Sequence, residues 1–132
     1  MLCTAHWTLG LKAIGKNLSD FKRLRDAKEY AISNIPSELL PPWSMSHVRH
    51  PCTVWTSESN ENYLWHVRLM RALLDEYTVR YKKRHKAEAA YEWVCSGPPT
   101  NIERVGFVEH PQCMPDECKV PGDPVAAYRN YY

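Results

Sequence analysis

Five positively charged side chains are concentrated in one short tract of the sequence. Residues 80–86 read RYKKRHK, so five Lys or Arg residues and one histidine fall within seven positions. Arginine binds phosphate through two parallel hydrogen bonds, and lysine neutralises it as a point charge. The tract therefore predicts binding of a nucleic-acid backbone or a nucleotide phosphate by Arg80, Lys83, Arg84, His85 and Lys86. The alternative is a solvated helix end, where such cations contribute about 0.3–1 kcal/mol against the helix dipole.

Three polar residues that step by four precede this tract. Glu58, Asn62 and His66 would share one side of a helix. A carboxylate, an amide and an imidazole together could position a water molecule or a base edge, with Glu58 as the general base and His66 as a second catalytic candidate. His50, just before Pro51, could join them as a further nucleic-acid contact. The alternative is that Asn62 and His66 are exposed and that Glu58 only complements the helix N-terminus.

The cysteines do not suggest disulfides or a metal centre. They stand at positions 3, 52, 95, 113 and 118, an odd number without paired spacing. His110, Cys113 and Cys118 with Cys95 lack the spacing of a zinc knuckle, so we expect no metal and no cofactor. No signal peptide and no apolar run long enough for a membrane helix is present in the sequence, so reduced thiols in the cytoplasm are expected, without a membrane partner.

The apolar spacing predicts the element that carries these residues. A helix is expected over residues 59–83, with Ser59 as its N-cap, because apolar side chains recur at spacings of four and three. The expected fold is mainly α, an irregular helical bundle around this long central helix, in a single domain over residues 1–132. The side chains expected to be largely buried are Leu64, Val67, Met70, Leu74, Tyr77 and Tyr81 of this helix, together with Phe21, Trp55 and Trp93.

The same reasoning places four further helices. They are expected over residues 2–14, 20–33, 86–95 and 124–132. Gly15 can end the first in the left-handed conformation, Ser19 can cap the second, and Asp123 with Pro124 can start the last. Residues 33–51 contain four prolines and predict a connection with one short helical turn.

Two features lie outside these helices. Val105, Phe107 and Val108 could form a short extended segment. Both ends of the chain fall inside helical patterns, and Tyr128, Tyr131 and Tyr132 place three large rings in the last five residues. Chain ends are usually polar and frayed, so we expect either a fragment truncated at both ends or a homo-oligomer that covers the ends.

Several of these segments resemble a family of uncharacterised small proteins from bacteriophages and some bacteria. The similar segments are LCTAHW, HPCTVWTSESNENYLW, EYTVRYKKRHK and MPDECKVPGDPVAAYRNYY, so the resemblance covers the beginning of the chain and residues 50–132 but not 15–45. It implies further sequence at both ends. It also implies no zinc site at Cys113 and Cys118, whose positions are not typically cysteine in similar sequences.

A looser resemblance is to the small all-α pyrimidine-dimer DNA glycosylases of phages. It implies an N-terminal amine nucleophile and an early helical glutamate, but residue 2 is Leu and no residue before position 20 is acidic. Two functions are therefore expected as alternatives. The first is a phage-type protein that handles DNA or nucleotides through its basic helix end, with DNA-base processing as one activity. The second is a helical interaction or dimerisation module without enzymatic activity.

Overall fold

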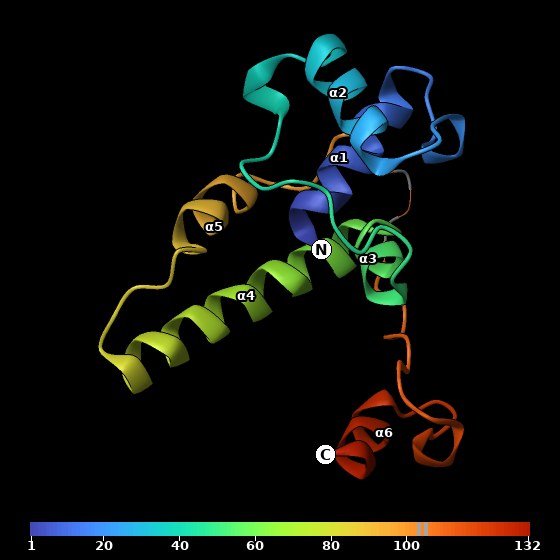
Figure 1. Ribbon diagram of the computed structural model, residues 1–132. Coiled ribbons are helices and arrows are strands. Elements are labelled where there is room, and N and C mark those ends of the chain that lie inside the picture. The colour runs from blue at the N-terminus through green and yellow to red at the C-terminus, as the bar shows by residue number, and fades with distance from the viewer. Residues whose placement is uncertain (103, 105) are drawn as a thin grey trace.

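Helices make up the regular structure of this chain, as the sequence predicts. The computed structural model describes residues 1–102, 104 and 106–132, and no strand occurs within them. The α-helices are α1 (Leu2–Ala13), α2 (Leu24–Asn34), α3 (Pro51–Thr56), α4 (Asn60–Tyr81), α5 (Glu88–Val94) and α6 (Pro124–Tyr131). Single 3₁₀ turns lie at η1 (Leu18–Asp20), η2 (Ser37–Leu39) and η3 (Asp116–Cys118). The predicted class, mainly α with one long central helix, is confirmed (Figure 1).

The long helix α4 has a local reason for each of its boundaries. The Ser59 hydroxyl accepts a hydrogen bond from the Asn62 backbone N–H at 3.1 Å, which confirms Ser59 as the N-cap. At the other end Lys82 takes a left-handed conformation, with φ 54°, and its N–H donates to the Thr78 carbonyl. The helix therefore ends at Tyr81, slightly before the predicted limit.

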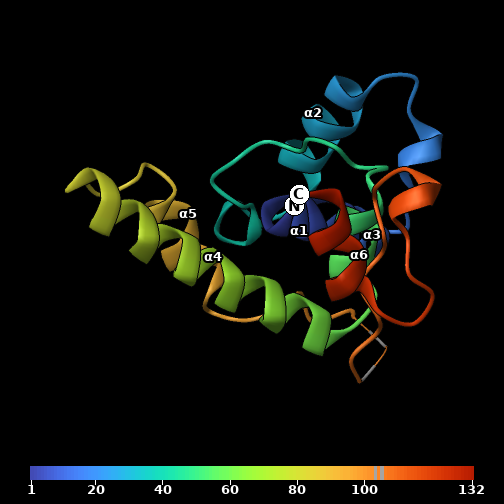
Figure 2. The ribbon, with the colours of Figure 1, turned by 90° about the horizontal axis from the view of Figure 1, so that it is seen from below.

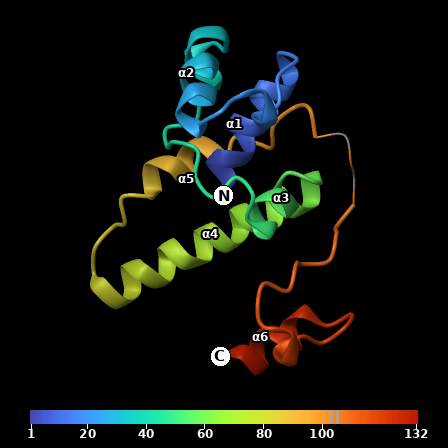
Figure 3. The ribbon, with the colours of Figure 1, turned by 45° about the vertical axis from the view of Figure 1, so that its right-hand side comes forward.

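The first helix takes a larger part in the packing than the sequence predicts. α1 contacts α2, α3, α4 and α5, whereas α4 contacts α1, α3 and α5. Figures 2 and 3 show α1 near the middle of the molecule, with α2 and α4 on different sides of it. One apolar cluster joins α1, α4 and α5 through Leu2, Leu9, Tyr63, Val67 and Val94. A second joins α1 to α2 through Trp7, Leu11, Ala27 and Ala31.

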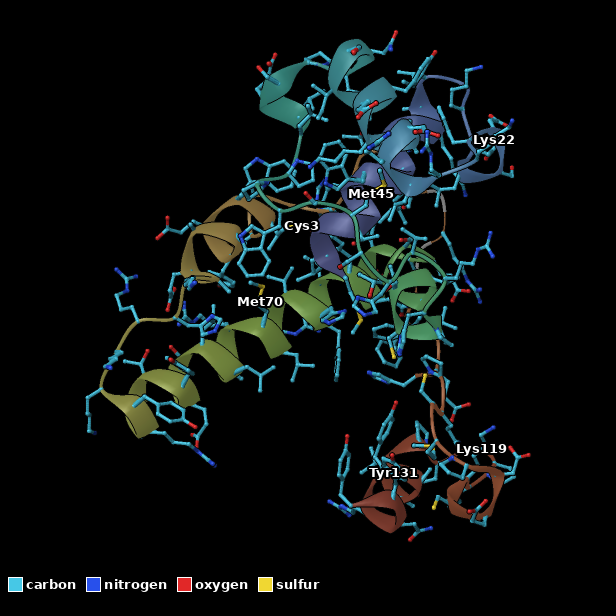
Figure 4. All side chains as sticks on the ribbon, viewed as in Figure 1. Cys3, Lys22, Met45, Met70, Lys119 and Tyr131 are labelled. Atoms are coloured by element: carbon cyan, nitrogen blue, oxygen red, sulfur yellow. The ribbon has the colours of Figure 1, made fainter. Side chains whose placement is uncertain are left out.

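The predicted core is confirmed for three residues and partly confirmed for four. Val67, Leu74 and Trp55 are buried. The half-buried members of the predicted set are Phe21, Met70, Tyr77 and Trp93. Figure 4 shows the Met70 side chain on the side of α4 that faces α5, where it packs against the first cluster.

The prediction was wrong for two residues of α4. Leu64 is 41% exposed and Tyr81 is 61% exposed. Each helical residue turns by about 100°, so Leu64 points away from the face that its neighbour Tyr63 buries. Tyr81 lies in the last turn, where α4 extends past α5 (Figure 1).

The second helix begins later than predicted. Ser19 lies inside η1 rather than at a helix N-cap, and α2 begins at Leu24 after Arg23. The Asp20 carboxylate accepts a hydrogen bond from the Asn17 backbone N–H at 2.9 Å. This local hydrogen bond closes η1 as a separate turn that ends at Asp20. Three residues then connect η1 to the start of α2 at Leu24.

A short helix, α3, follows the proline-rich connection and was not predicted. The connection itself contains the single turn η2, in agreement with the sequence. α3 starts with Pro51 at its first position, and its N-cap His50 accepts a hydrogen bond at Nδ1 from the Cys52 N–H at 3.2 Å. Three of its six residues, Thr53, Val54 and Thr56, are β-branched and have weak helix propensity, so the pattern gave no helical signal.

The C-terminal segment folds back onto itself below α3 and α4 (Figures 1 and 3). The Asp123 side chain accepts a hydrogen bond from the Ala126 N–H at 2.9 Å, and Pro124 is the first residue of α6, as predicted. α6 contacts η3. The Tyr128 hydroxyl donates a hydrogen bond to the Pro111 carbonyl at 3.1 Å, which links α6 to the irregular segment that precedes η3.

The chain between α5 and η3 forms no strand in its described part. Phe107 and Val108 have no regular secondary structure, and Val105 of the predicted extended segment lies outside the described residues. The Val108 carbonyl accepts a hydrogen bond from Trp55 Nε1 at 2.9 Å, which attaches this segment to α3. Among the helices that the structure describes, none has both the length and the apolar character needed to cross a membrane.

Candidate functional site

The arginines of the basic tract lie at the free end of α4 and in the turn that leads to α5. Arg80 pairs with Glu76 one helical turn earlier. Arg84 approaches Glu88 at 3.7 Å. Both arginines are exposed, so ion pairing with a glutamate weakens the positive charge that each arginine presents to a ligand but does not cancel it.

The other residues of the tract differ in their surroundings. Lys83 and Lys86 are exposed and form no ion pair with any residue that the structure describes. His85 is half-buried, accepts a hydrogen bond at Nδ1 from the Ala87 N–H at 3.1 Å, and meets the Tyr77 ring edge-on. The tract is thus an exposed surface, and its residues line neither of the two cavities described below.

An ion pair that the sequence pattern did not reveal joins α4 to α5. The Arg71 guanidinium donates to both carboxylate oxygens of Glu88, at 2.9 and 3.0 Å, and also lies 2.7 Å from Asp75. Arg71 holds the pKa of Glu88 below its usual range. The bidentate geometry fixes the relative orientation of the two helices on either side of the basic tract.

The structure separates the three polar residues that step by four. Glu58 is exposed in the turn after α3 and lines neither cavity. Asn62 is fully buried: its side-chain amide donates to the Trp55 carbonyl at 2.9 Å and accepts from the Val108 N–H at 2.9 Å. Asn62 therefore holds the fold together and is out of reach of a base, which corrects its predicted role. Of the three, only His66 faces a cavity.

An apolar cavity lies between α3, α4 and α6. Its volume is about 500 Å³ and its surface is almost wholly apolar. The residues that line it are Met1, Cys52, Trp55, Trp65, His66, Leu69, His110, Pro111, Pro124, Val125, Tyr128, Arg129 and Tyr132. A smaller cavity of about 190 Å³ shares Met1, His66 and Leu69 with it. The larger cavity has the size and the apolar walls that are typical of small-molecule sites.

His66 lines this cavity and keeps one ring nitrogen as a hydrogen-bond acceptor. Thr56 donates its hydroxyl hydrogen to the Cys52 carbonyl at 2.6 Å, so its oxygen is left to accept from His66 Nδ1 at 2.8 Å. The neutral ring therefore carries its hydrogen on Nδ1, and Nε2 keeps a free lone pair. Burial lowers the pKa of His66 to about 4, so the ring is neutral at pH 7.

His110 belongs to an aromatic wall of the same cavity. Its ring stacks on Trp55, with the ring centroids 4.3 Å apart and an angle of 28° between the planes, and it meets Trp65 edge-on at 4.1 Å. Its Nε2 is buried without a hydrogen-bond partner among the described residues. Burial lowers the pKa of His110 as well, so this wall is uncharged at neutral pH.

One charged side chain, Arg129 of α6, is found among the described lining residues. It is exposed and forms no ion pair with the part of the chain that the structure describes. The Met1 amino group is a second positive group at the cavity, near His66. The Arg129 guanidinium is the side chain available to pair with an anionic group of a bound molecule.

Two thiols and an imidazole meet beside the cavity. Cys52 and Cys113 place their sulfur atoms 3.6 Å apart, and His50 offers a ring nitrogen close to both. Burial, followed by the neighbouring Cys113, raises the pKa of Cys52 to about 11. We call these three residues the thiol–imidazole cluster. The predicted contact of His50 with Glu58 and Asn62 is thus replaced by a contact with two cysteines.

Comparison with protein-family models, with curated proteins and with solved structures gives no match to this chain. The site therefore has to be interpreted from its own geometry.

The sequence pattern missed most of the cavity. Its lining residues come from the chain start, α3, α4, residues 110–111 and α6, and helical periodicity within one element cannot reveal such a meeting. The tyrosines near the C-terminus are the available signal, because Tyr128 and Tyr132 both line the cavity. From the sequence alone, these rings indicate truncation or oligomerisation instead.

Proposed function

We propose that the protein binds a small amphipathic molecule with an aromatic or other ring-shaped apolar body and one anionic group. The observation that carries this proposal is the cavity of about 500 Å³ with aromatic walls and a single charged side chain among its described lining residues. The apolar body would lie against Trp55 and Trp65, where aromatic contacts favour a flat ring. The anionic group would reach Arg129.

The electrostatics of the cavity support a ligand with little charge on its buried part. His66 and His110 are both neutral at pH 7 because burial lowers the pKa of each ring. A ligand charge placed against these neutral rings would lose its hydration and gain no opposite charge from them. The Nε2 atom of His66 can instead accept one hydrogen bond from a hydroxyl or amide group of the ligand.

A pair of probe molecules tests this proposal. Naphthalene-2-carboxylate carries a flat apolar body and an anionic group, whereas 2-naphthylmethanol has the same body without the charge. We expect the carboxylate to bind about tenfold more tightly, because a charge-assisted hydrogen bond to Arg129 contributes about 1.4 kcal/mol. Titration calorimetry gives both affinities, and quenching of tryptophan fluorescence gives an independent check.

Two arginine variants separate the anionic contact from general charge. In Arg129→Gln the two probes should bind equally, with the affinity for 2-naphthylmethanol unchanged. Arg49→Gln, which alters an exposed arginine outside both cavities, should keep the tenfold preference. A preference that survives in Arg129→Gln, or a wild-type protein that binds neither probe, would contradict the proposal.

A second candidate function is the binding of a nucleic-acid or nucleotide phosphate by the basic tract. One observation favours it: Lys82, Lys83 and Lys86 are exposed together and form no ion pair with the described residues. An α-helix rises 1.5 Å per residue, so Arg80 lies about 16 Å along α4 from Leu69 in the cavity wall. The phosphate contact and the cavity would therefore be separate sites.

This second function predicts a salt dependence. If three lysines contact phosphates, the logarithm of the affinity for duplex DNA should fall with the logarithm of the salt concentration with a slope of about −2.7. The double substitution Lys83→Gln, Lys86→Gln should bring the slope to about −0.9, whereas Lys12→Gln, Lys22→Gln should leave it unchanged. Fluorescence anisotropy with a labelled duplex measures the slope, and a slope near zero for the wild type would exclude the contact.

A further inference from the structure

We propose that the thiol–imidazole cluster binds a thiophilic divalent metal ion such as Zn²⁺, with His50, Cys52 and Cys113 as ligands. Nothing in the sequence pattern predicted this site, because Cys113 is separated from the other two residues by more than 60 positions. Cys118, the cysteine nearest to Cys113 in the sequence, is not part of the cluster.

The ligand atoms are already close to the positions that a bound ion requires. One ring nitrogen of His50 and the sulfur atoms of Cys52 and Cys113 all lie within 4.8 Å of one another. His50 and Cys52 are held at the start of α3, and Cys113 lies in the segment that precedes η3. All three residues are half-buried, so an ion could reach them from solvent and still be partly shielded.

The distance between the two sulfur atoms favours a metal site over a disulfide. A disulfide bond is about 2.05 Å long. In a tetrahedral zinc site with Zn–S bonds of about 2.3 Å, the two sulfur atoms lie about 3.8 Å apart. The observed separation of 3.6 Å is close to the second value. Zinc could therefore bind with a small adjustment of the two sulfur atoms.

The segment that carries Cys113 is braced on both sides. The side-chain carbonyl of Gln112 accepts a hydrogen bond from the Val120 N–H at 2.9 Å, and its amide donates back to the Val120 carbonyl. Met114 is buried, and Tyr128 holds Pro111 through its hydroxyl. This bracing fixes the position of Cys113 before any ion binds, which lowers the entropic cost of binding.

The hydrogen bond of the His50 imidazole limits the affinity of the cluster for a metal ion. His50 Nδ1 accepts a hydrogen bond from the Cys52 N–H, so an ion bound at Nδ1 replaces that hydrogen bond. An ion bound at Nε2 requires the other tautomer of the ring. In either case the two cysteines supply most of the binding energy and His50 supplies a smaller part.

The number of ligands indicates the kind of metal site. Closed structural zinc sites have four protein ligands, whereas sites with three keep one position for water or a ligand. The cluster offers three, and Cys52 also lines the large cavity. The fourth position of the ion would therefore be open to solvent or to a molecule in the cavity.

Cobalt binding tests the site directly, because Co²⁺ takes the place of Zn²⁺ and gives a thiolate-to-metal absorption band in the near ultraviolet. The full chain, kept reduced, should bind one equivalent of Co²⁺ and show this band, and one equivalent of Zn²⁺ should abolish it. Cys52→Ser and Cys113→Ser should each lose the band, and His50→Asn should weaken binding about tenfold or more. Cys95→Ser and Cys118→Ser should bind as the wild type does.

A second measurement needs no variant and so does not depend on how a variant folds. Zn²⁺ should slow the alkylation of Cys52 and Cys113 by iodoacetamide at least tenfold, while Cys95, which is exposed, reacts at an unchanged rate. Absence of the cobalt band, or equal alkylation of Cys52 and Cys113 with and without Zn²⁺, would overturn the proposal. Naphthalene-2-carboxylate binding is measured with a chelator present, so the outcome for the cavity does not depend on the outcome for the metal.

Discussion

Replacing Asn62 with leucine is expected to lower the free energy of unfolding by about 1–3 kcal/mol. The Asn62 side chain is fully buried and links the end of α3 to the segment after α5, through the Trp55 carbonyl and the Val108 N–H. Leucine has a similar volume but cannot replace either hydrogen bond. The substitution would leave the half-buried Val108 N–H without its partner, and the Trp55 carbonyl would keep only the hydrogen bond from the Glu58 N–H at 3.2 Å. One such unsatisfied group costs about 1–3 kcal/mol.

Urea denaturation followed by circular dichroism measures this change. Asn130→Leu, at an exposed position of α6, is the matched control and should change the free energy of unfolding by less than about 0.5 kcal/mol. If Asn62→Leu were as mild as the control, the structural role of Asn62 would be contradicted. The predicted base-contact role from the sequence would then become tenable again.

Lowering the pH from 6.5 to 5 is expected to destabilise the protein by at least about 3 kcal/mol, with about 1.5 kcal/mol from each of His6 and His66. His110, whose pKa burial also lowers, adds to this loss in the same direction. Burial lowers the pKa of His6 and of His66 to about 4 in the folded state, from an ordinary value of 6.5. Between these two pKa values the unfolded chain binds protons that the folded chain does not. The free energy of unfolding must therefore rise as the pH rises through this window and fall as the pH falls.

The hydrogen bonds of the two rings explain why the neutral forms are favoured. Tyr63 donates its hydroxyl hydrogen to the Val94 carbonyl at 3.0 Å, so its oxygen accepts from His6 Nε2 at 2.7 Å. His66 in the same way donates to Thr56. Each neutral ring has its hydrogen bond, and a second proton would add a charge to a largely buried site.

Urea denaturation at a series of pH values between 6.5 and 5 tests this prediction above the range in which carboxylates titrate. His66→Gln should reduce the pH dependence by about 1.5 kcal/mol, whereas His47→Asn, at an exposed position in the connection before α3, should retain all of it. A free energy of unfolding that stays constant across this window would show that neither ring is held neutral by the fold.

The helices could be predicted because their signals are local. Ser59 and Asp123 accept hydrogen bonds from backbone N–H groups within three residues, and Gly15 takes the left-handed conformation, with φ 74°, directly after α1 and Ile14. Such signals depend on neighbours in the chain, so sequence alone carries them. The start of α2 was misplaced for a related reason, since the hydrogen bond between Asn17 and Asp20 competes with the expected cap at Ser19.

The candidate sites could not be predicted in the same way, because tertiary structure creates them. Cys113 becomes a neighbour of Cys52 only when the C-terminal segment folds back below α3. The walls of the cavity likewise come from segments far apart in the chain. The sequence did identify the basic tract and His66, but it could not show that they lie in different parts of the molecule.

The central claim, that a flat apolar ligand occupies the cavity between α3, α4 and α6, is tested most directly by NMR. With naphthalene-2-carboxylate bound, we predict nuclear Overhauser effects from the naphthalene ring protons to the methyl groups of Leu69 and Val125, on opposite elements of the cavity wall. If the probe binds to saturation but shows nuclear Overhauser effects only to exposed residues outside the cavity, such as Val79, the account is contradicted.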